Sequence, residues 1–215
     1  MTQPQWQPGP ERIAQSNLSR FMAQANARHQ LSLRTYEDVH GWSVERSPDF
    51  WTLVWDFFGV VASSRGDTSL VNADAMPGAR WFPGAQLNFA ENLLRRRDGK
   101  TAFVFRGEDQ VERRMSYAEL YALVSRLSQS LRACGVGPGD RVAGYLPNMP
   151  ETIAGMLAAV SVGATWASCS PDFGVQGVID RFGQIEPKVL FCADGYFYNG
   201  RPFDSLEKTR DVVAA

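Results

Sequence analysis

Apolar residues in the second half of the chain follow the spacing of helices and strands in turn. Over residues 117–131 they recur every three or four positions, which predicts an amphipathic helix. Ser116 and Glu119 have the spacing of a capping box at its start, and Gly135 suits its end. The helix is therefore expected to begin at Ser116 and to stop at Gly135.

Short apolar runs after this helix alternate with further helical stretches. A second helix, capped by Asn148, is expected to reach Gly163, and a third is expected over 175–184. The runs typical of strands are Arg141–Leu146, Thr165–Cys169 and Lys188–Cys192. Because strands separated by helices need crossover connections, the pattern predicts an α/β fold with a parallel sheet and flanking helices.

The first part of the chain is richer in aromatic residues. One helix is expected over Ile13–His29, and a second is expected to begin at Ser47 as its N-cap and to end at Gly59. An aromatic and apolar stripe on the second helix is open to two interpretations, a ligand box or packing against the next segment, and we favour packing. The stripe consists of Phe50, Trp51, Val54, Trp55 and Phe58.

Two local patterns join these halves. Asn88 and Glu91 have capping-box spacing, which predicts a short helix from about Asn88 to Arg95. Two β-prone runs then flank Gly107–Asp109, which predicts a hairpin.

Composition excludes several classes of partner. The 215 residues carry a formal net charge of −1, so no general field attracts nucleic acid or an anionic membrane. The most apolar segment, Ile153–Ala167, is too short to span a bilayer. Three separated cysteines argue against a disulfide framework or zinc site, and each is expected to be a small buried residue. We expect a soluble, cytoplasmic protein.

Candidate chemistry is sparse. Gly135–Asp140 is rich in glycine, but no lysine follows and the next element is a strand, so we expect a tight turn instead of a phosphate cradle. His29 and His40 lack acids at ligand spacing, which predicts no metal site. The serines lack a plausible base, and we predict no catalytic residue in this chain.

Longer stretches resemble a known superfamily. Residues 115–164 read MSYAELYALVSRLSQSLRACGVGPGDRVAGYLPNMPETIAGMLAAVSVGA, which is similar to the opening of the adenylate-forming acyl-CoA synthetases. Upstream, FWTLVWDFFGV and ARWFPGAQLNFAENLL resemble the N-terminal segment of the acetyl-CoA synthetase branch. Downstream, SPDFGVQGVIDRFGQIEPKVLF and ADGYFYNGR resemble the acetoacetate–CoA ligases, whereas acetyl-CoA synthetases have a Gly-Gly-Phe-type sequence in place of Pro171–Gly174.

The resemblance implies a two-step reaction. A carboxylate, here acetoacetate, attacks the α-phosphate of ATP with Mg²⁺ to give an acyl-adenylate, and the thiol of CoA then displaces AMP. It also implies an N-terminal segment over residues 1–98 and the start of an AMP-binding domain over 99–215, an incomplete large domain. The family's phosphate loop, its adenine-binding motifs and its C-terminal domain have no counterpart here. We therefore expect this segment to be inactive alone, to bind none of these ligands tightly and to self-associate. The alternatives are a non-catalytic CoA- or nucleotide-binding module and an interaction protein.

The resemblance points to two groups of binding residues. Tyr198, Asn199, Gly200 and Arg201 align with an Arg-x-Gly-Arg segment that contacts CoA phosphates in relatives, although Tyr198 replaces the first arginine. An arginine on a glycine-containing loop can fork onto a phosphate, and the alternative is a surface hairpin with a solvated arginine.

The second group, Asp172 and Phe173, lies at the carboxyl end of a predicted strand, where ligands of open α/β sheets bind. Family analogy places this loop near CoA. For the loop Ser170–Gly174 we favour helix capping by Ser170 and Asp172 as the main role, with proximity to the ligand second.

Overall fold

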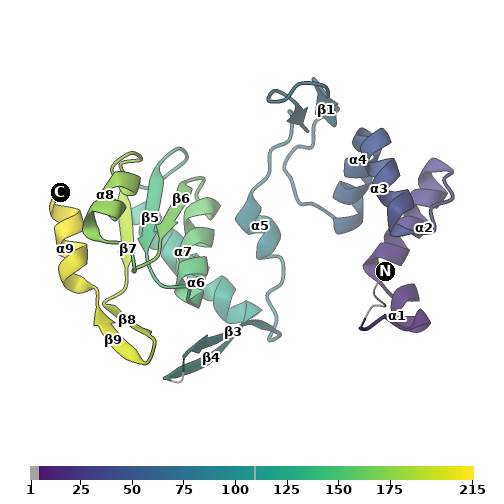
Figure 1. The fold of residues 1–215 in the computed structure, drawn as a ribbon. Helices are drawn as coiled ribbons and strands as arrows, with labels where there is room; N and C mark the ends of the chain where they lie inside the picture. Colours follow the sequence, from purple (N-terminus) through teal and green to yellow (C-terminus); the bar gives the residue numbers. More distant parts are fainter. Residues whose placement is uncertain (1–4, 109) are drawn as a thin grey trace. The chain divides into compact units, whose positions relative to one another are not determined.

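A computed structural model describes residues 5–108 and 110–215 (Figure 1). The chain forms two compact units, Met1–Gln86 and Leu87–Ala215, and each is considered by itself.

The first unit is helical, with one small antiparallel pair of strands. Its elements are α1 (Pro10–Ala14), α2 (Asn17–His29), α3 (Tyr36–Glu45), α4 (Ser47–Phe58), β1 (Leu70–Val71) and β2 (Arg80–Trp81). Phe21, Trp42 and Leu53 are buried at its centre, each from a different helix. The aromatic stripe of α4 packs as predicted, because Trp51 and Trp55 contact the rings of Trp81 and Phe82 in the following segment.

Two expectations about helix ends in this unit are wrong. The chain from Ile13 to His29 is broken into two helices, because the Ser16 hydroxyl accepts a hydrogen bond from Ser19 N and caps α2. Ser47 is the first residue of α4 and not its N-cap. Its hydroxyl donates to the carbonyl of Ser43 at the end of α3, so it is already engaged by the preceding helix.

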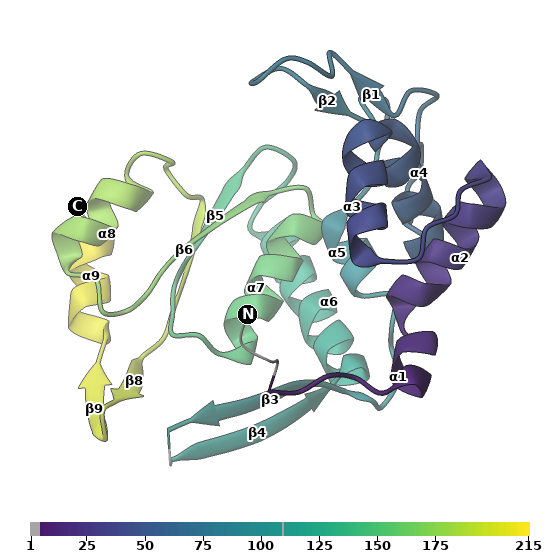
Figure 2. The ribbon, with the colours of Figure 1, turned by 45° about the vertical axis from the view of Figure 1, so that its right-hand side comes forward.

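The second unit is a three-layer α/β arrangement. Its elements are α5 (Phe89–Leu93), β3 (Thr101–Gly107), β4 (Val111–Ser116), α6 (Tyr117–Ala133), β5 (Arg141–Tyr145), α7 (Pro150–Ser161), β6 (Thr165–Cys169), α8 (Val175–Phe182), β7 (Val189–Cys192), β8 (Gly195–Tyr198), β9 (Arg201–Asp204) and α9 (Leu206–Ala214). The sheet is parallel, as the alternating pattern predicts, and its strand order is β6-β5-β7. Helices α6 and α7 lie on one side of this sheet and α8 and α9 on the other (Figure 2).

Side-chain alternation along β5 explains these layers. Val142 joins the core formed with α6 and α7, whereas Ala143 and Tyr145 join the core formed with α8. Gly144, between them, faces the ring of Trp166 so closely that an added Cβ would lie 2.5 Å from its Cζ2 atom. This position therefore needs the smallest residue.

Several predicted helix ends in this unit are confirmed. Ser116 and Glu119 form both bonds of the capping box. Asn88 caps α5 by accepting from Glu91 N, although α5 ends at Leu93, before the expected Arg95. The strands β3 and β4 form the predicted hairpin, of which Asp109 lies outside the described residues.

The expected cap at Asn148 is wrong. Met149 occupies the N-cap position of α7 without a side-chain bond, and Pro150 opens the helix. Thr152 instead closes this turn by donating to the Pro147 carbonyl.

Helix α5 belongs to the second unit by its contacts. The Asn88 side chain donates to the Val160 carbonyl of α7 over 2.9 Å, and Ala90 is fully buried in the core with α6 and α7. The boundary between the two compact units accordingly falls before α5 in the sequence, between Gln86 and Leu87. The division into functional domains at residues 98 and 99 stays a prediction.

The surface carries features that the sequence did not predict. Cys169 is buried, but Cys134 and Cys192 are exposed, so the expectation of three buried thiols is wrong for these two. Cys134 lies at the end of α6 and Cys192 ends an outer strand, where the chain leaves the core.

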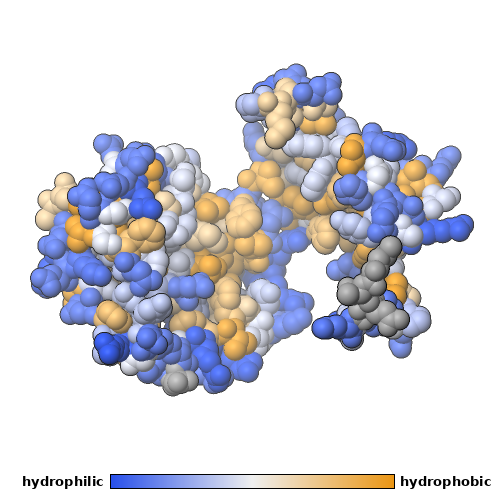
Figure 3. All heavy atoms as spheres, in the orientation of Figure 1, coloured by the Kyte–Doolittle hydropathy of each residue, from blue (hydrophilic) through white to orange (hydrophobic). Residues whose placement is uncertain are grey.

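Hydrophobic residues also reach the surface (Figure 3). Within the described residues, the structure contains no helix long and apolar enough to cross a membrane.

Candidate functional site

The loop Ser170–Gly174 follows the carboxyl end of β6 and is held by the sheet beneath it. The buried Tyr145 hydroxyl donates to the carbonyls of Phe173, over 2.6 Å, and Pro171, over 3.1 Å. Burial raises the pKa of Tyr145 above its ordinary value, so the hydroxyl keeps the proton for these bonds further into the alkaline range than an exposed tyrosine does. The loop is thus fixed from β5.

The expectation that this loop caps α8 with its side chains is wrong. Gly174 is the N-cap and has no side-chain bond to the helix. The Ser170 hydroxyl instead donates to Asp172 over 2.9 Å, which keeps both side chains within the loop. Asp172 is left free to accept a bond from another element.

That bond comes from β8, the strand whose last residue is Tyr198. The Tyr196 hydroxyl donates to the second oxygen of Asp172 over 3.0 Å. Burial, followed by the bond to Asp172, raises the pKa of Tyr196 to about 12. The structure therefore brings Asp172 and the hairpin that carries Arg201 together through one hydrogen bond.

Phe173 lies beside Asp172 but has a different contact. The guanidinium carbon of Arg181 lies 4.2 Å from the centre of its ring, a cation–π contact. Arg181 also donates to the Gly177 carbonyl, so it is held along α8. Phe173 therefore contacts the last turn of α8 through Arg181, while 37% of its own surface stays exposed.

Tyr198, Asn199, Gly200 and Arg201 form the end of the β8–β9 hairpin. Tyr198 pairs with Arg201, and Asn199 and Gly200 make the turn with φ values of 52° and 73°. Two positive φ values are the signature of a type I′ turn, for which Asn-Gly is a favoured pair. Both interpretations of these residues share this geometry: Arg201 is exposed, and among described residues its guanidinium has no ion-pair partner.

Glu108 is the residue of this region that sequence reasoning missed. It lies at the tip of the β3–β4 hairpin, and its carboxylate accepts from Asn199 N over 2.5 Å and from Gly200 N over 2.7 Å. The two hairpin tips consequently lie next to each other (Figure 1; Figure 2). No sequence pattern predicts this contact, because a glutamate in a hairpin turn is ordinary and Glu108 lies 91 positions before Asn199.

A cleft of about 750 Å³ lies between these two hairpins and the loop after β5. Its lining is largely apolar, and includes Phe105, Val111, Met149, Phe197, Phe203 and Leu206. Such a cleft suits an uncharged portion of a ligand, and the polar turn at Asn199–Gly200 lies at the end of the β8–β9 hairpin that forms one wall.

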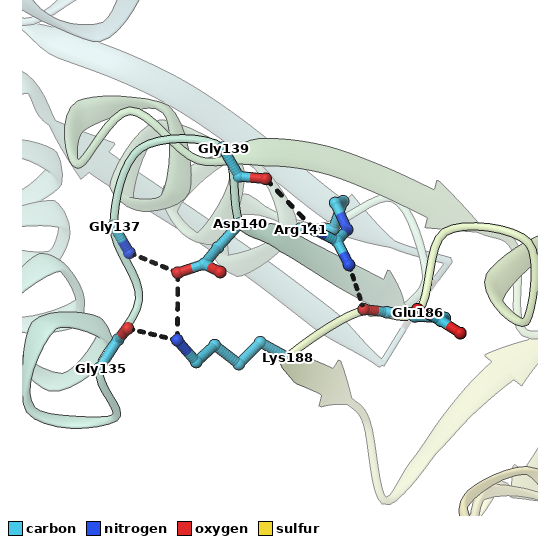
Figure 4. Close-up of polar contacts among 7 residues, drawn as sticks. All are labelled: Gly135, Gly137, Gly139, Asp140, Arg141, Glu186 and Lys188. Carbon is cyan, nitrogen blue, oxygen red and sulfur yellow. Dashed lines mark hydrogen bonds and ion pairs between the residues drawn. The ribbon is translucent and has the colours of Figure 1, made fainter.

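The glycine-rich connection before β5 is a structural link, as predicted. Asp140 accepts from Gly137 N over 2.8 Å and from Lys188 Nζ over 3.2 Å, and Lys188 also donates to the Gly135 carbonyl (Figure 4). The Gly137 amide and, second, Lys188 hold the pKa of Asp140 below its ordinary value. Because this loop enters β5, it lies at the opposite end of the parallel sheet from Ser170–Gly174.

Metal ligands are not assembled here. Within residues 5–108 and 110–215, no group of three or more His, Cys, Asp or Glu side chains could hold a metal ion.

Relatives of known name resemble the chain over nearly its whole length. It is 52% identical over 210 residues to the acetoacetyl-coenzyme A synthetase of Rhizobium meliloti (strain 1021), which covers 98% of this chain and 32% of that protein. It is 39% identical over 202 residues to the malonamoyl-CoA synthetase vrtB of Penicillium aethiopicum, covering 91% of this chain and 28% of that protein.

A solved structure agrees with these relatives. The acetoacetyl-CoA synthetase from Streptomyces lividans superimposes with a TM-score of 0.90 at 43% identity, over 98% of this chain and 33% of that one. The chain spans about a third of the length of the relatives it matches.

Two family models match the sequence in tandem. Residues 36–93 match the acetyl-coenzyme A synthetase N-terminus, and residues 89–214 match the AMP-binding enzyme model. The second match covers more than half of the chain. The chain belongs to the AMP-binding enzyme family.

Proposed function

We propose that this chain is the N-terminal part of an acetoacetate–CoA ligase, a cytoplasmic enzyme that forms acetoacetyl-CoA from acetoacetate, ATP and CoA through an acyl-adenylate. The observation that carries the proposal is the 52% identity with an acetoacetyl-coenzyme A synthetase over 98% of the chain. Mg²⁺ would support the adenylation step.

Within that enzyme we assign this part to CoA binding and not to bond making. The exposed Arg201 guanidinium can fork onto a CoA phosphate, and the adjacent Tyr198, 60% exposed, can stack on the adenine ring. The Asn199–Gly200 turn fixes where these two side chains emerge. Asp172 supports the same hairpin through Tyr196. The loop after β6 therefore forms a second side of the proposed CoA-binding region around Tyr198 and Arg201, which we call the CoA foothold.

The choice of carboxylic acid is the sharpest test of this proposal. Relatives named for acetoacetyl-CoA and malonamoyl-CoA synthesis both resemble this chain, so the acid has to be measured. The complete synthetase that contains this segment should be assayed for acid-dependent pyrophosphate release with acetoacetate, malonamate and acetate. We expect the highest kcat/KM with acetoacetate. A higher value with either other acid would overturn the assignment.

Residues 1–215 alone should be inactive. We identify no phosphate-binding loop in their sequence, and the described residues contain no group of three or more His, Cys, Asp or Glu side chains that could hold a metal ion. With ATP, Mg²⁺, acetoacetate and CoA, the purified segment should release no pyrophosphate above background. Clear turnover by a homogeneous preparation would contradict this.

The isolated segment should also self-associate. The described sheet ends in β6 and β7 as outer strands, and an apolar groove of about 490 Å³ lies along Leu190, Val212 and Val213. Unpaired strand edges and exposed apolar grooves favour association between copies. Sedimentation velocity should show dimers or larger species, and a monodisperse monomer at all concentrations would be the opposite result.

A further inference from the structure

The Glu108 side chain joins the tips of two hairpins that are far apart in the sequence. Both oxygens of Glu108, in the β3–β4 turn, accept from consecutive backbone amides, those of Asn199 and Gly200. The turn between β8 and β9 is thus bound by an internal carboxylate. Both hairpins belong to the same compact unit.

The contact has a direct consequence for the turn. In a type I′ turn the amides of the two central residues are not used by the hairpin's own ladder, so at this exposed turn they are free to bond to water or to an acceptor from another element. Consecutive backbone N–H groups that converge on one point favour an anion, and here Glu108 supplies it. A phosphate near this turn must therefore be met by a side chain and not by these amides.

The nearest such side chain follows the turn directly. Arg201 begins β9, is exposed, and has no ion-pair partner among the described residues. Its direction depends on how the short hairpin is held. The base of the hairpin is fixed by Tyr196 on Asp172 and by the Ser205 amide on the Asp194 carbonyl.

The tip needs its own fixation. Strands β8 and β9 have four residues each, and a two-stranded hairpin of this size is only marginally ordered without further contacts. Glu108 provides the contact that holds the tip.

We propose that Glu108 is a positioning residue for CoA. Its carboxylate locks the Asn199–Gly200 turn against the β3–β4 hairpin, and this sets the direction in which Arg201 meets the cofactor phosphate. The inference rests on the proposed function, because it assigns Glu108 to the same CoA foothold. A gate, in which Glu108 leaves the amides when phosphate arrives, would have the opposite effect on affinity.

The test uses Glu108→Gln in the complete synthetase. Glutamine keeps the length but offers a donor where the carboxylate offered an acceptor, so at least one of the two bonds to the turn is lost. We expect the KM for CoA to rise about tenfold, with acetoacetate-dependent ATP–pyrophosphate exchange unchanged because that half-reaction uses no CoA. Glu112→Gln is the matched control: it removes the same charge from the same hairpin, and its carboxylate pairs only with Arg106 across the strands among the described residues.

A double mutant separates positioning from other roles. If Glu108 acts through Arg201, then Glu108→Gln should add little to the effect of Arg201→Ala, so the two changes should be non-additive. Full additivity would overturn the proposal, as would a fall in the KM for CoA, an unchanged KM, or an equal loss of both half-reactions.

The Arg201→Ala and Glu108→Gln variants separate a failure of the proposed CoA site from a failure of the positioning role of Glu108. If Arg201→Ala leaves the KM for CoA unchanged, the CoA foothold is overturned, and the positioning role of Glu108 is overturned with it. If the KM for CoA rises in Arg201→Ala but not in Glu108→Gln, only the positioning role of Glu108 is overturned, and the proposal of the CoA foothold is retained.

Discussion

The Tyr196 hydroxyl donates to the Asp172 carboxylate over 3.0 Å and so ties the β8–β9 hairpin to the loop after β6. Asp172 was expected to cap a helix, but it serves as the acceptor that anchors a second element. The bond fixes the base of the hairpin, as Glu108 fixes its tip.

Tyr196→Phe should loosen the base of the hairpin. The change removes only the hydroxyl, leaves Asp172 to water because that carboxylate is exposed, and keeps the ring that stacks on Phe203. We expect a loss of about 0.5–1.5 kcal/mol in stability and a rise in the KM for CoA. Thermal unfolding and CoA kinetics of the complete enzyme measure both. Tyr36→Phe, at an exposed tyrosine of α3, is the control, and equal effects from the two variants would contradict the assigned role.

Arg201→Ala should weaken CoA binding selectively. A charge-assisted contact to phosphate is worth about 1.5–3 kcal/mol, so the KM for CoA should rise roughly 10- to 150-fold. ATP–pyrophosphate exchange should hardly change. Dephospho-CoA, which lacks the 3′-phosphate, should lose its disadvantage in the variant if that phosphate is the partner.

The control for this prediction is Arg210→Ala, which removes an exposed arginine from α9. It should leave the KM for CoA unchanged. Loss of both half-reactions in Arg201→Ala would mean that Arg201 supports the fold and not the cofactor.

Acid should weaken the link between Asp140 and its neighbours. The Gly137 amide and Lys188 hold the pKa of Asp140 below its ordinary value. A carboxyl group whose pKa is lower in the folded state stabilises the fold at pH above its unfolded pKa, near 4, and this stabilisation is lost as pH falls through the folded pKa. Asp140→Asn should therefore be less stable than the parent at neutral pH, with the difference shrinking below about pH 4.

Thermal unfolding measured at a series of pH values tests this expectation. Asp211→Asn, at an exposed carboxylate of α9, is the matched control and should run parallel to the parent. A difference for Asp140→Asn that stays constant down to the lowest pH would rule out a role for its charge.

Gly144→Ala should destabilise the second unit through overpacking. The added methyl would lie 2.5 Å from Cζ2 of Trp166, whose ring is also packed near Gly155 and Phe191. Overpacking in a core costs about 1–3 kcal/mol. Gly99→Ala, which meets no atom within 4 Å, is the control in chemical denaturation. A Gly144→Ala enzyme as stable as the control would mean that the Trp166 ring can move aside at little cost.

Much of the architecture could be predicted from local pattern. The capping box of Ser116 and Glu119 joins residues three positions apart, a distance that helix geometry fixes by itself. The strand Thr165–Cys169 matches its prediction because a short apolar run between two helical patterns favours a buried strand. Asn199–Gly200 likewise forms the turn that its two residue types favour.

Helix ends were predicted less well where two options compete over one or two residues. At Asn148 the side chain could have capped the helix, but the chain enters α7 one residue later, through Met149 and Pro150. At Ser47 the hydroxyl found a carbonyl in the preceding helix first. Such outcomes depend on how neighbouring elements pack, which local spacing does not encode.

The sequence by itself determined the parallel sheet with its helices and the family resemblance. Only the tertiary structure decided that Glu108 binds the Asn199–Gly200 turn and that Tyr196 binds Asp172. The physical reason is range: hydrogen bonds between residues three or four apart follow from backbone geometry. A bond across 91 positions forms only after strand register and hairpin direction have been fixed by the packing of the whole unit.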